Sequence, residues 1–205
     1  MIEIPYAINK IFWGLLLVLL DINIIYFDIL PDVIGYIMIV SGISGLKPYS
    51  LFFRKAKIAA VFLVILSVPA FFLIPAIPLD EFQPSSSSLI TMASSTIFGL
   101  LHLVVIYYSI YGLIEMAKKL NIYELPERSQ DRLNVYLIGS LGTMTVFPFI
   151  LNVSDQAAFY IIIISFIISI TLEITILTLI RKYRKHFLYL EEQDKELLSV
   201  NKLYK

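Results

Sequence analysis

The chain has 205 residues, of which 59% are hydrophobic and only 16% are charged, whereas about a quarter of the residues in a soluble domain are charged. Together with a mean hydropathy of +0.84, this composition excludes an ordinary soluble domain and predicts an integral membrane protein. Sixteen basic residues balance sixteen acidic ones, so no net field points to nucleic acid as a partner. The absence of cysteine excludes disulfides, thiolate catalysis and cysteine-ligated metals.

Six apolar stretches predict the fold, because a helix of about 20 residues crosses a hydrocarbon core of about 30 Å. In chain order, the expected spans are residues 8–27, 31–46, 58–79, 89–114, 135–153 and 157–180. The expected fold class is therefore all-α, with one polytopic transmembrane helix bundle over residues 1–186. A cytoplasmic tail follows over residues 187–205, where charges mixed with leucines favour an amphipathic helix.

Local signals define the ends of several spans. No signal-peptide cleavage pattern follows the first apolar run, so we expect this span to be retained. Pro31 fits an early position in the second helix. Three prolines at 69, 75 and 78 predict a kink or an early end in the third span. The four serines at 85–88 predict a loop before the fourth span.

Basic residues predict the orientation, because loops rich in lysine and arginine stay in the cytoplasm. All sixteen basic residues lie in the N-terminus, the second and fourth connections, or the tail. The first, third and fifth connections contain acids and no basic residue. We therefore expect both termini in the cytoplasm and only short segments outside the membrane.

The acids of the outer connections have two explanations. Asp28 and Asp32 lie before and within the first turn of the second helix, where a carboxylate favours the positive end of the helix. Alternatively, the outer acids form a mouth that attracts cations or a basic partner. The residues of this candidate outer acidic mouth are Asp28, Asp32, Asp80, Glu81 and Asp155.

Ionisable and amide side chains inside the spans form a candidate intramembrane polar site. A charge near the bilayer centre costs about 2.5 kcal/mol or more, so such residues indicate function by default. The set consists of Asp21, Asn23, His102 and Glu173. We expect these groups to lie at different depths and not all to touch. The expected partners of Glu173 are Tyr107, Tyr108 and Tyr111 of the fourth span. A structural role, with each group hydrogen-bonded in the bundle, remains the alternative.

Small residues recur at helical spacing and predict closely packed helices, because small side chains let helix backbones approach in lipid. The pairs are Gly35 with Gly42, Ser41 with Gly45, Ser95 with Gly99, and Gly139 with Thr143. The pattern favours packing within one chain, and dimerisation remains the alternative.

One stretch carries a family resemblance. The sequence Phe27-Asp28-Ile-Leu-Pro31-Asp32-Val-Ile-Gly35-Tyr36 is similar to a stretch in small uncharacterised multi-pass membrane proteins of Gram-positive bacteria. The resemblance covers the first two spans. It implies a bacterial cell membrane, no assigned activity and no site residue.

A basic cluster after the sixth span suggests partners at the membrane surface. The residues Arg181, Lys182, Arg184 and Lys185 fix the orientation and are suited to anionic lipid. The tail beyond them is expected to lie on the membrane or to bind a membrane or cytoplasmic protein.

The sequence contains no catalytic, cofactor or metal motif, so we expect no cofactor and a non-enzymatic role. The leading hypothesis is an embedded regulatory or interaction subunit. The alternative is a small transporter or channel for a proton, a cation or a small solute, using Asp21, His102 and Glu173. The two differ in whether these side chains line one cavity.

Overall fold

The computed structural model describes residues 3–21, 32–73, 86–122 and 124–203, which form six α-helices and one 3-10 helix. The helices are α1 (Glu3–Asp21), α2 (Asp32–Leu46), α3 (Leu51–Leu73), α4 (Ser86–Lys119), α5 (Glu124–Val146) and α6 (Asp155–Leu203), with the 3-10 helix η1 (Phe147–Asn152) between α5 and α6. No strand occurs in these ranges. The expected all-α fold class is confirmed.

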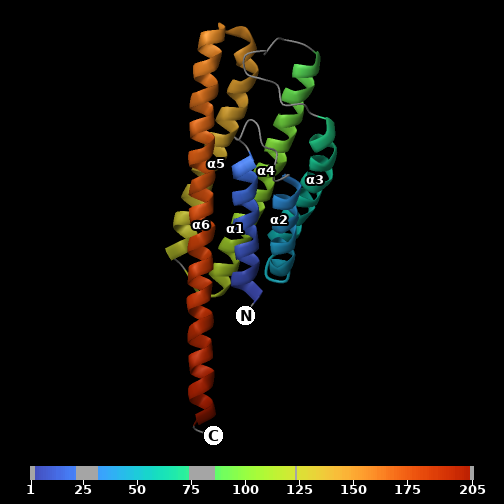
Figure 1. The fold of residues 1–205 in the computed structure, drawn as a ribbon. Coiled ribbons are helices and arrows are strands. Elements are labelled where there is room, and N and C mark those ends of the chain that lie inside the picture. The colour runs from blue at the N-terminus through green and yellow to red at the C-terminus, as the bar shows by residue number, and fades with distance from the viewer. Residues whose placement is uncertain (1–2, 22–31, 74–85, 123, 204–205) are drawn as a thin grey trace.

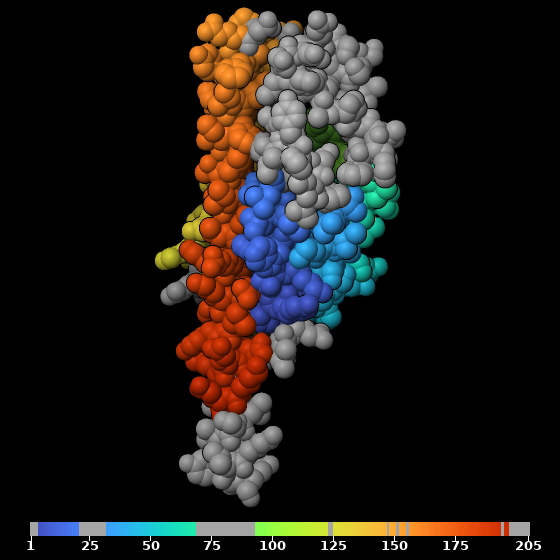
Figure 2. All heavy atoms as spheres, in the orientation of Figure 1, coloured from blue at the N-terminus to red at the C-terminus, as the bar shows by residue number. Residues whose placement is uncertain are grey.

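The helices form a closed bundle in which neighbours in the chain are neighbours in space. Each helix packs against the next, and α6 returns to pack against α1. Successive helices run in opposite directions, so the two ends marked N and C lie toward the same end of the bundle (Figure 1). The space-filling view shows α1 and α6 side by side on one face (Figure 2). Buried side chains from all six helices fill the interior of this ring.

Three segments are long and apolar enough to cross a membrane, namely Ala93–Lys119, Leu125–Ile150 and Gln156–Gln193. They correspond to the fourth, fifth and sixth predicted spans. Two further apolar segments, Ile4–Leu20 and Asp32–Leu46, are shorter. Residues 22–31 and 74–85, which contain the expected ends of the first and third spans, lie outside the described residues.

Several helices extend beyond the apolar stretches that predicted them. Helix α3 begins at Leu51 and α5 at Glu124, seven and eleven residues before the expected spans (58 − 51 and 135 − 124). The predicted loop at serines 85–88 is wrong for its last three residues, because α4 begins at Ser86. Hydropathy marks the apolar part of a helix, whereas the backbone continues into polar residues until a cap ends it.

A defined turn joins α4 to α5. Asn121 has a φ of 59°, in the left-handed region that asparagine tolerates better than most residues. The amide of Ile122 donates to the carbonyl of Ala117 at 3.0 Å, which satisfies a carbonyl at the helix end. Pro126 then stands in the first turn of α5, where its missing N–H costs nothing.

Glycines bring α1 and α2 into close contact. A Cβ added to Gly14 would lie 2.6 Å from the Gly35 carbonyl oxygen, and one added to Gly42 would lie 2.6 Å from the Ala7 carbonyl oxygen. Both obstacles are backbone atoms, so only glycine fits at these crossing points. The predicted role of Gly35 and Gly42 in close packing is confirmed, and the partner is a helix of the same chain.

Apolar side chains also cover the outside of the helices. Ile58, Phe62 and Ile65 are more than half exposed on α3, and Val135 and Ile138 are more than half exposed on α5. On α3 these residues are spaced four and three apart, so they form one outward stripe. Polar groups, by contrast, meet in the interior. This arrangement is what a helix bundle surrounded by lipid requires.

Candidate functional site

A histidine and a glutamate meet inside the bundle. His102 of α4 and Glu173 of α6 approach to 3.2 Å between Nε2 and Oε1. Their side chains are only 14% and 13% exposed. The two residues are 71 positions apart in the chain, so the contact depends on the bundle, in which α4 and α6 both pack against α5. Two residues of the predicted intramembrane polar site are therefore partners.

Helix α5 supplies a third member of this group. The Tyr136 hydroxyl donates to the same Glu173 Oε1 at 2.6 Å, and only 2% of the tyrosine is exposed. The Ser140 side chain, one turn further along α5, hydrogen-bonds with Tyr136. A carboxylate that accepts two hydrogen bonds in a low-dielectric interior is held in a defined position.

Helix α2 also contacts the histidine. The rings of Tyr36 and His102 lie edge to face, with centroids 6.2 Å apart. Asp32 stands one turn earlier on the same face of α2 and interacts electrostatically with His102. We call Asp32, Tyr36, His102, Tyr136, Ser140 and Glu173 the interior polar cluster. Four helices contribute to it.

The cluster lies within the apolar part of the bundle. Glu173 is eighteen residues after the start of α6 and eight before Arg181, or about 27 Å and about 12 Å along the helix axis. Leu172, Ile176 and Leu177 beside it are buried apolar residues. A lone carboxylate would be costly here, and the histidine and tyrosine compensate for that cost.

The remaining predicted site residues are placed as follows. Asp21 ends α1 and Asp155 begins α6, but their side chains are outside the described part of the structure, as are Asn23, Asp28, Asp80 and Glu81 as whole residues. Asp32 was expected in an outer acidic mouth, and the structure adds its interaction with His102.

The predicted partners of Glu173 are wrong. The bonds of Glu173 go to His102 and Tyr136. The ring of Tyr107 contacts those of Tyr108 and Tyr111, and both of these rings contact Phe52 of α3. The amide nitrogen of Gln130 donates to the Tyr111 hydroxyl at 2.9 Å, whereas Glu173 bonds Tyr136, six residues further along α5. Six residues correspond to about 9 Å, so Tyr111 is offset from Glu173 by about this distance, toward the start of α5.

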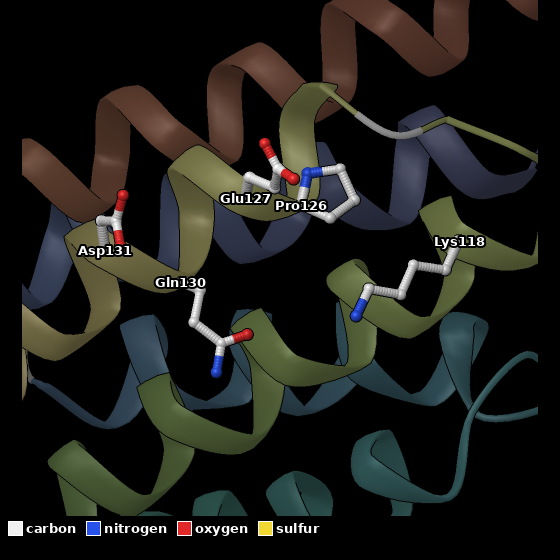
Figure 3. A pocket seen from close by; sticks show the side chains of 5 residues that line it. All are labelled: Lys118, Pro126, Glu127, Gln130 and Asp131. Atoms are coloured by element: carbon white, nitrogen blue, oxygen red, sulfur yellow. The ribbon is translucent and has the colours of Figure 1, made fainter.

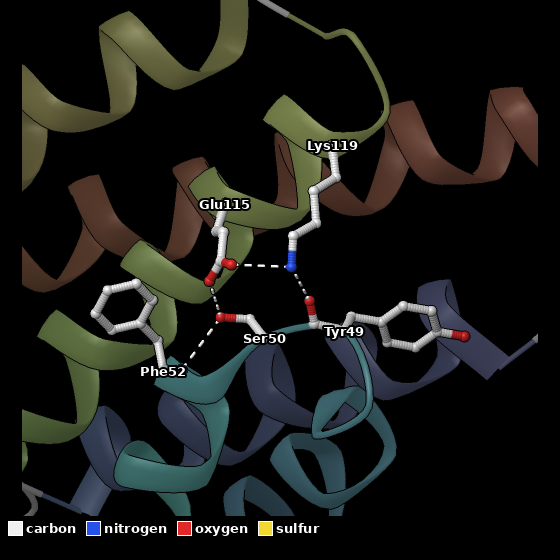
Figure 4. Close-up of polar contacts among 5 residues, drawn as sticks. All are labelled: Tyr49, Ser50, Phe52, Glu115 and Lys119. Carbon is white, nitrogen blue, oxygen red and sulfur yellow. Dashed lines mark hydrogen bonds and ion pairs between the residues drawn. The ribbon is translucent and has the colours of Figure 1, made fainter.

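A second polar network joins the α2–α3 turn to the end of α4 (Figure 4). Ser50 donates to Glu115 and accepts from the Phe52 amide at 3.1 Å, which caps the start of α3. Lys119 bonds Glu115 at 2.9 Å and the Tyr49 carbonyl at 3.1 Å. This network was not predicted from the sequence. The spacing of Glu115 and Lys119, four apart at a helix end, was the available signal.

An open pocket lies nearby, where α4 meets α5. It has a volume of about 510 Å³ and is lined by Lys118, Pro126, Glu127, Gln130 and Asp131. Figure 3 shows that Lys118 comes from α4 and the other four residues from α5. Three of the five side chains are charged and exposed, so the pocket belongs to the polar end of the bundle.

The interior polar cluster combines one imidazole with two carboxylates and three hydroxyl groups. In the described ranges, no three histidine, cysteine or carboxylate side chains are grouped to hold a metal ion. Comparisons with protein-family models, with curated protein sequences and with solved structures found no match.

Proposed function

We propose that this chain is a six-span protein of a bacterial cell membrane, with both termini in the cytoplasm. Apolar side chains on the outside of α3 and α5 and the three long apolar segments support embedding in lipid. The resemblance of residues 27–36 to multi-pass proteins of Gram-positive bacteria supports the cell membrane.

Contacts between basic segments support the orientation. Lys119 at the end of α4 bonds the Tyr49 carbonyl of the α2–α3 turn at 3.1 Å. Lys10 of α1 bonds Ser41 of α2 at 2.9 Å. The basic residues of these connections therefore share one end of the bundle, which is the end assigned to the cytoplasm.

Within this membrane protein, the interior polar cluster best supports a function as a small transporter or channel for protons or cations. The observation that carries this proposal is the 3.2 Å contact of His102 with Glu173 inside the apolar part of the bundle. Histidine is the side chain whose ordinary titration falls near physiological pH. Ionisable residues in such positions typically mark the paths of ions and protons through membranes.

The test compares proton flux with folded yield. The purified full-length chain is reconstituted in liposomes, and an entrapped pH-sensitive dye records the response to an imposed pH gradient. Glu173→Gln keeps a hydrogen-bonding side chain of the same size but removes the charge, so we expect flux to be lost at normal folded yield. Glu192→Gln, the same change at an exposed position of α6, is the matched control. Unchanged flux in Glu173→Gln would exclude the cluster from transport.

A second candidate function rests on the length of α6. This helix continues through the basic cluster to Leu203 and projects past the other helices near the end marked N (Figure 1). A projecting charged helix is suited to a regulatory or interaction subunit that binds a protein partner. Anionic lipid at Arg181, Lys182, Arg184 and Lys185 is compatible with either function.

The interaction hypothesis has its own test. A photo-crosslinking group at Glu192, which is exposed on α6, should give one defined crosslinked product in cells. The same group at Lys118, exposed at the end of α4, is the control. The same products at both positions would show that the projecting helix has no specific partner.

A further inference from the structure

The second ring nitrogen of His102 is available for an additional function. Nε2 is engaged by Glu173. Nδ1 is buried, and no side chain in the described part of the chain hydrogen-bonds to it. A buried polar atom without a hydrogen bond costs about 1–3 kcal/mol, so such an atom in a defined site indicates a ligand or a catalytic role.

The α2 side of the ring carries a carboxylate. Tyr36 places α2 against the histidine, with ring centroids 6.2 Å apart. Asp32 is one turn nearer the start of α2 and interacts electrostatically with His102. The imidazole is thus under the influence of two carboxylates from different helices, Asp32 from α2 and Glu173 from α6.

The other groups around the cluster are neutral hydrogen-bonding groups. Tyr136 donates to Glu173 Oε1 at 2.6 Å. The Tyr136 hydroxyl also hydrogen-bonds with Ser140 and interacts electrostatically with Tyr36. Tyr136 and His102 therefore bond the same oxygen of Glu173. The imidazole is the only nitrogen base of the cluster.

We propose that Asp32, His102 and Glu173 form a proton relay, which carries H⁺ across the imidazole between the start of α2 and the middle of α6. The relay rests on the proposed transport function and names its substrate as the proton. Asp32 is the third ionisable member of this relay.

The transfer conserves protons at each step. In the resting state Nε2–H donates to the Glu173 carboxylate, and Nδ1 holds a free electron pair. A proton from the Asp32 carboxyl bonds to Nδ1 and gives an imidazolium. The Nε2–H bond then breaks as its proton moves to Glu173 Oε1, which leaves a neutral ring protonated on Nδ1. Glu173 then releases its proton to water, and Asp32 takes up a proton from water on its own side. The ring returns to the starting tautomer as water removes the proton from Nδ1 and supplies one to Nε2.

Histidine NMR tests the relay directly, because the chain contains only two histidines. In a His186→Gln background with ¹⁵N-labelled histidine, every ring signal belongs to His102. The relay requires His102 to gain a proton reversibly between about pH 5 and pH 8. A ring that keeps one neutral tautomer over this range would overturn the proposal without any substitution in the cluster.

Substitution of Asp32 then tests its partnership. A nearby carboxylate changes the proton affinity of an imidazole by a factor of about ten or more, so Asp32→Asn should shift the titration midpoint of His102 and lower flux about tenfold. Asp32→Glu keeps the carboxylate and should preserve both. Asp131→Asn, an exposed position of α5, is the matched control.

The outcomes separate the relay from the transport function. If Glu173→Gln abolishes proton flux while Asp32→Asn changes neither the flux nor the His102 titration, the relay is wrong and transport stands. If the wild-type chain conducts no protons, the transport function fails, and the relay fails with it. One result supports both the relay and the transport function. Asp32→Asn lowers the flux and shifts the His102 titration, whereas Asp32→Glu keeps the wild-type flux and titration.

Discussion

Glu173 illustrates what a sequence reveals about a single buried charge. An acid within the sixth apolar stretch predicts a site that needs a partner, and His102 was identified on the same grounds. Their contact could not be predicted, because a sequence gives the depth of a residue only relative to the end of its own span. It does not give the offset between two spans along the bundle axis. The vertical offset between helices is set by packing, as the Tyr111–Gln130 bond shows. Tyr136 was missed because tyrosine is common in apolar helices and carries no charge.

Tyr136→Phe tests the support that α5 gives to this charge. The substitution keeps the ring and removes the hydroxyl that donates to Glu173. Hydrogen bonds to charged groups are worth about 1.5–3 kcal/mol, so we expect the free energy of unfolding to fall by about that amount. Unfolding of the purified chain in mixed detergent measures it.

The control for this substitution is Tyr160→Phe, where the side chain is 56% exposed on α6. Its free energy of unfolding should not change measurably. Equal losses in the two variants would mean that the hydroxyl of Tyr136 has no special role.

At the scale of the helix, sequence and structure agree on the existence of elements and differ on their ends. Apolar length located all six helices, whereas α3 and α5 begin among charged residues that hydropathy assigned to connections. Their starts depend on local bonds instead, such as the Ser50 cap of α3. The glycine spacing of α2 correctly predicted a close neighbour, although nothing in the pattern identified Gly14 of α1 as its counterpart.

Gly42→Ala should separate α1 from α2. The new methyl group would lie 2.6 Å from the Ala7 carbonyl oxygen and 2.7 Å from a side-chain carbon of Ile11, so the backbones must move apart. Overpacking of this kind costs about 1–3 kcal/mol. We expect a lower melting temperature in detergent.

The same substitution at Gly142 of α5 provides the comparison, because an added Cβ there meets no atom within 4 Å. Gly142→Ala should be neutral or slightly stabilising, since alanine favours the helix by up to about 1 kcal/mol. Identical melting temperatures for the two variants would contradict close packing at Gly42.

For the whole molecule, a closed ring of antiparallel helices brings both ends of the chain toward the same side. The prediction that both termini are cytoplasmic can be tested simply, because the chain has no cysteine to react in the background. Single cysteines at Ser86 and at Asp155 should react with an impermeant maleimide added to intact cells.

Cysteines at Arg128 and at Gln193 should react only after the membrane is opened. Both positions are exposed in the structure, so lack of reaction in intact cells reports the membrane barrier and not burial in the protein. Labelling of Gln193→Cys from outside would reverse the orientation.

Because α6 is one continuous helix, a small tilt near its middle produces a large displacement at its end. Glu173 and Leu203 belong to one helix and are thirty residues apart, which corresponds to about 45 Å. If α6 pivots near Glu173 when His102 exchanges its proton, a tilt of about 10° displaces the far end by about 8 Å. With the topology proposed above, proton exchange at His102 would thereby move the C-terminal end of α6 in the cytoplasm.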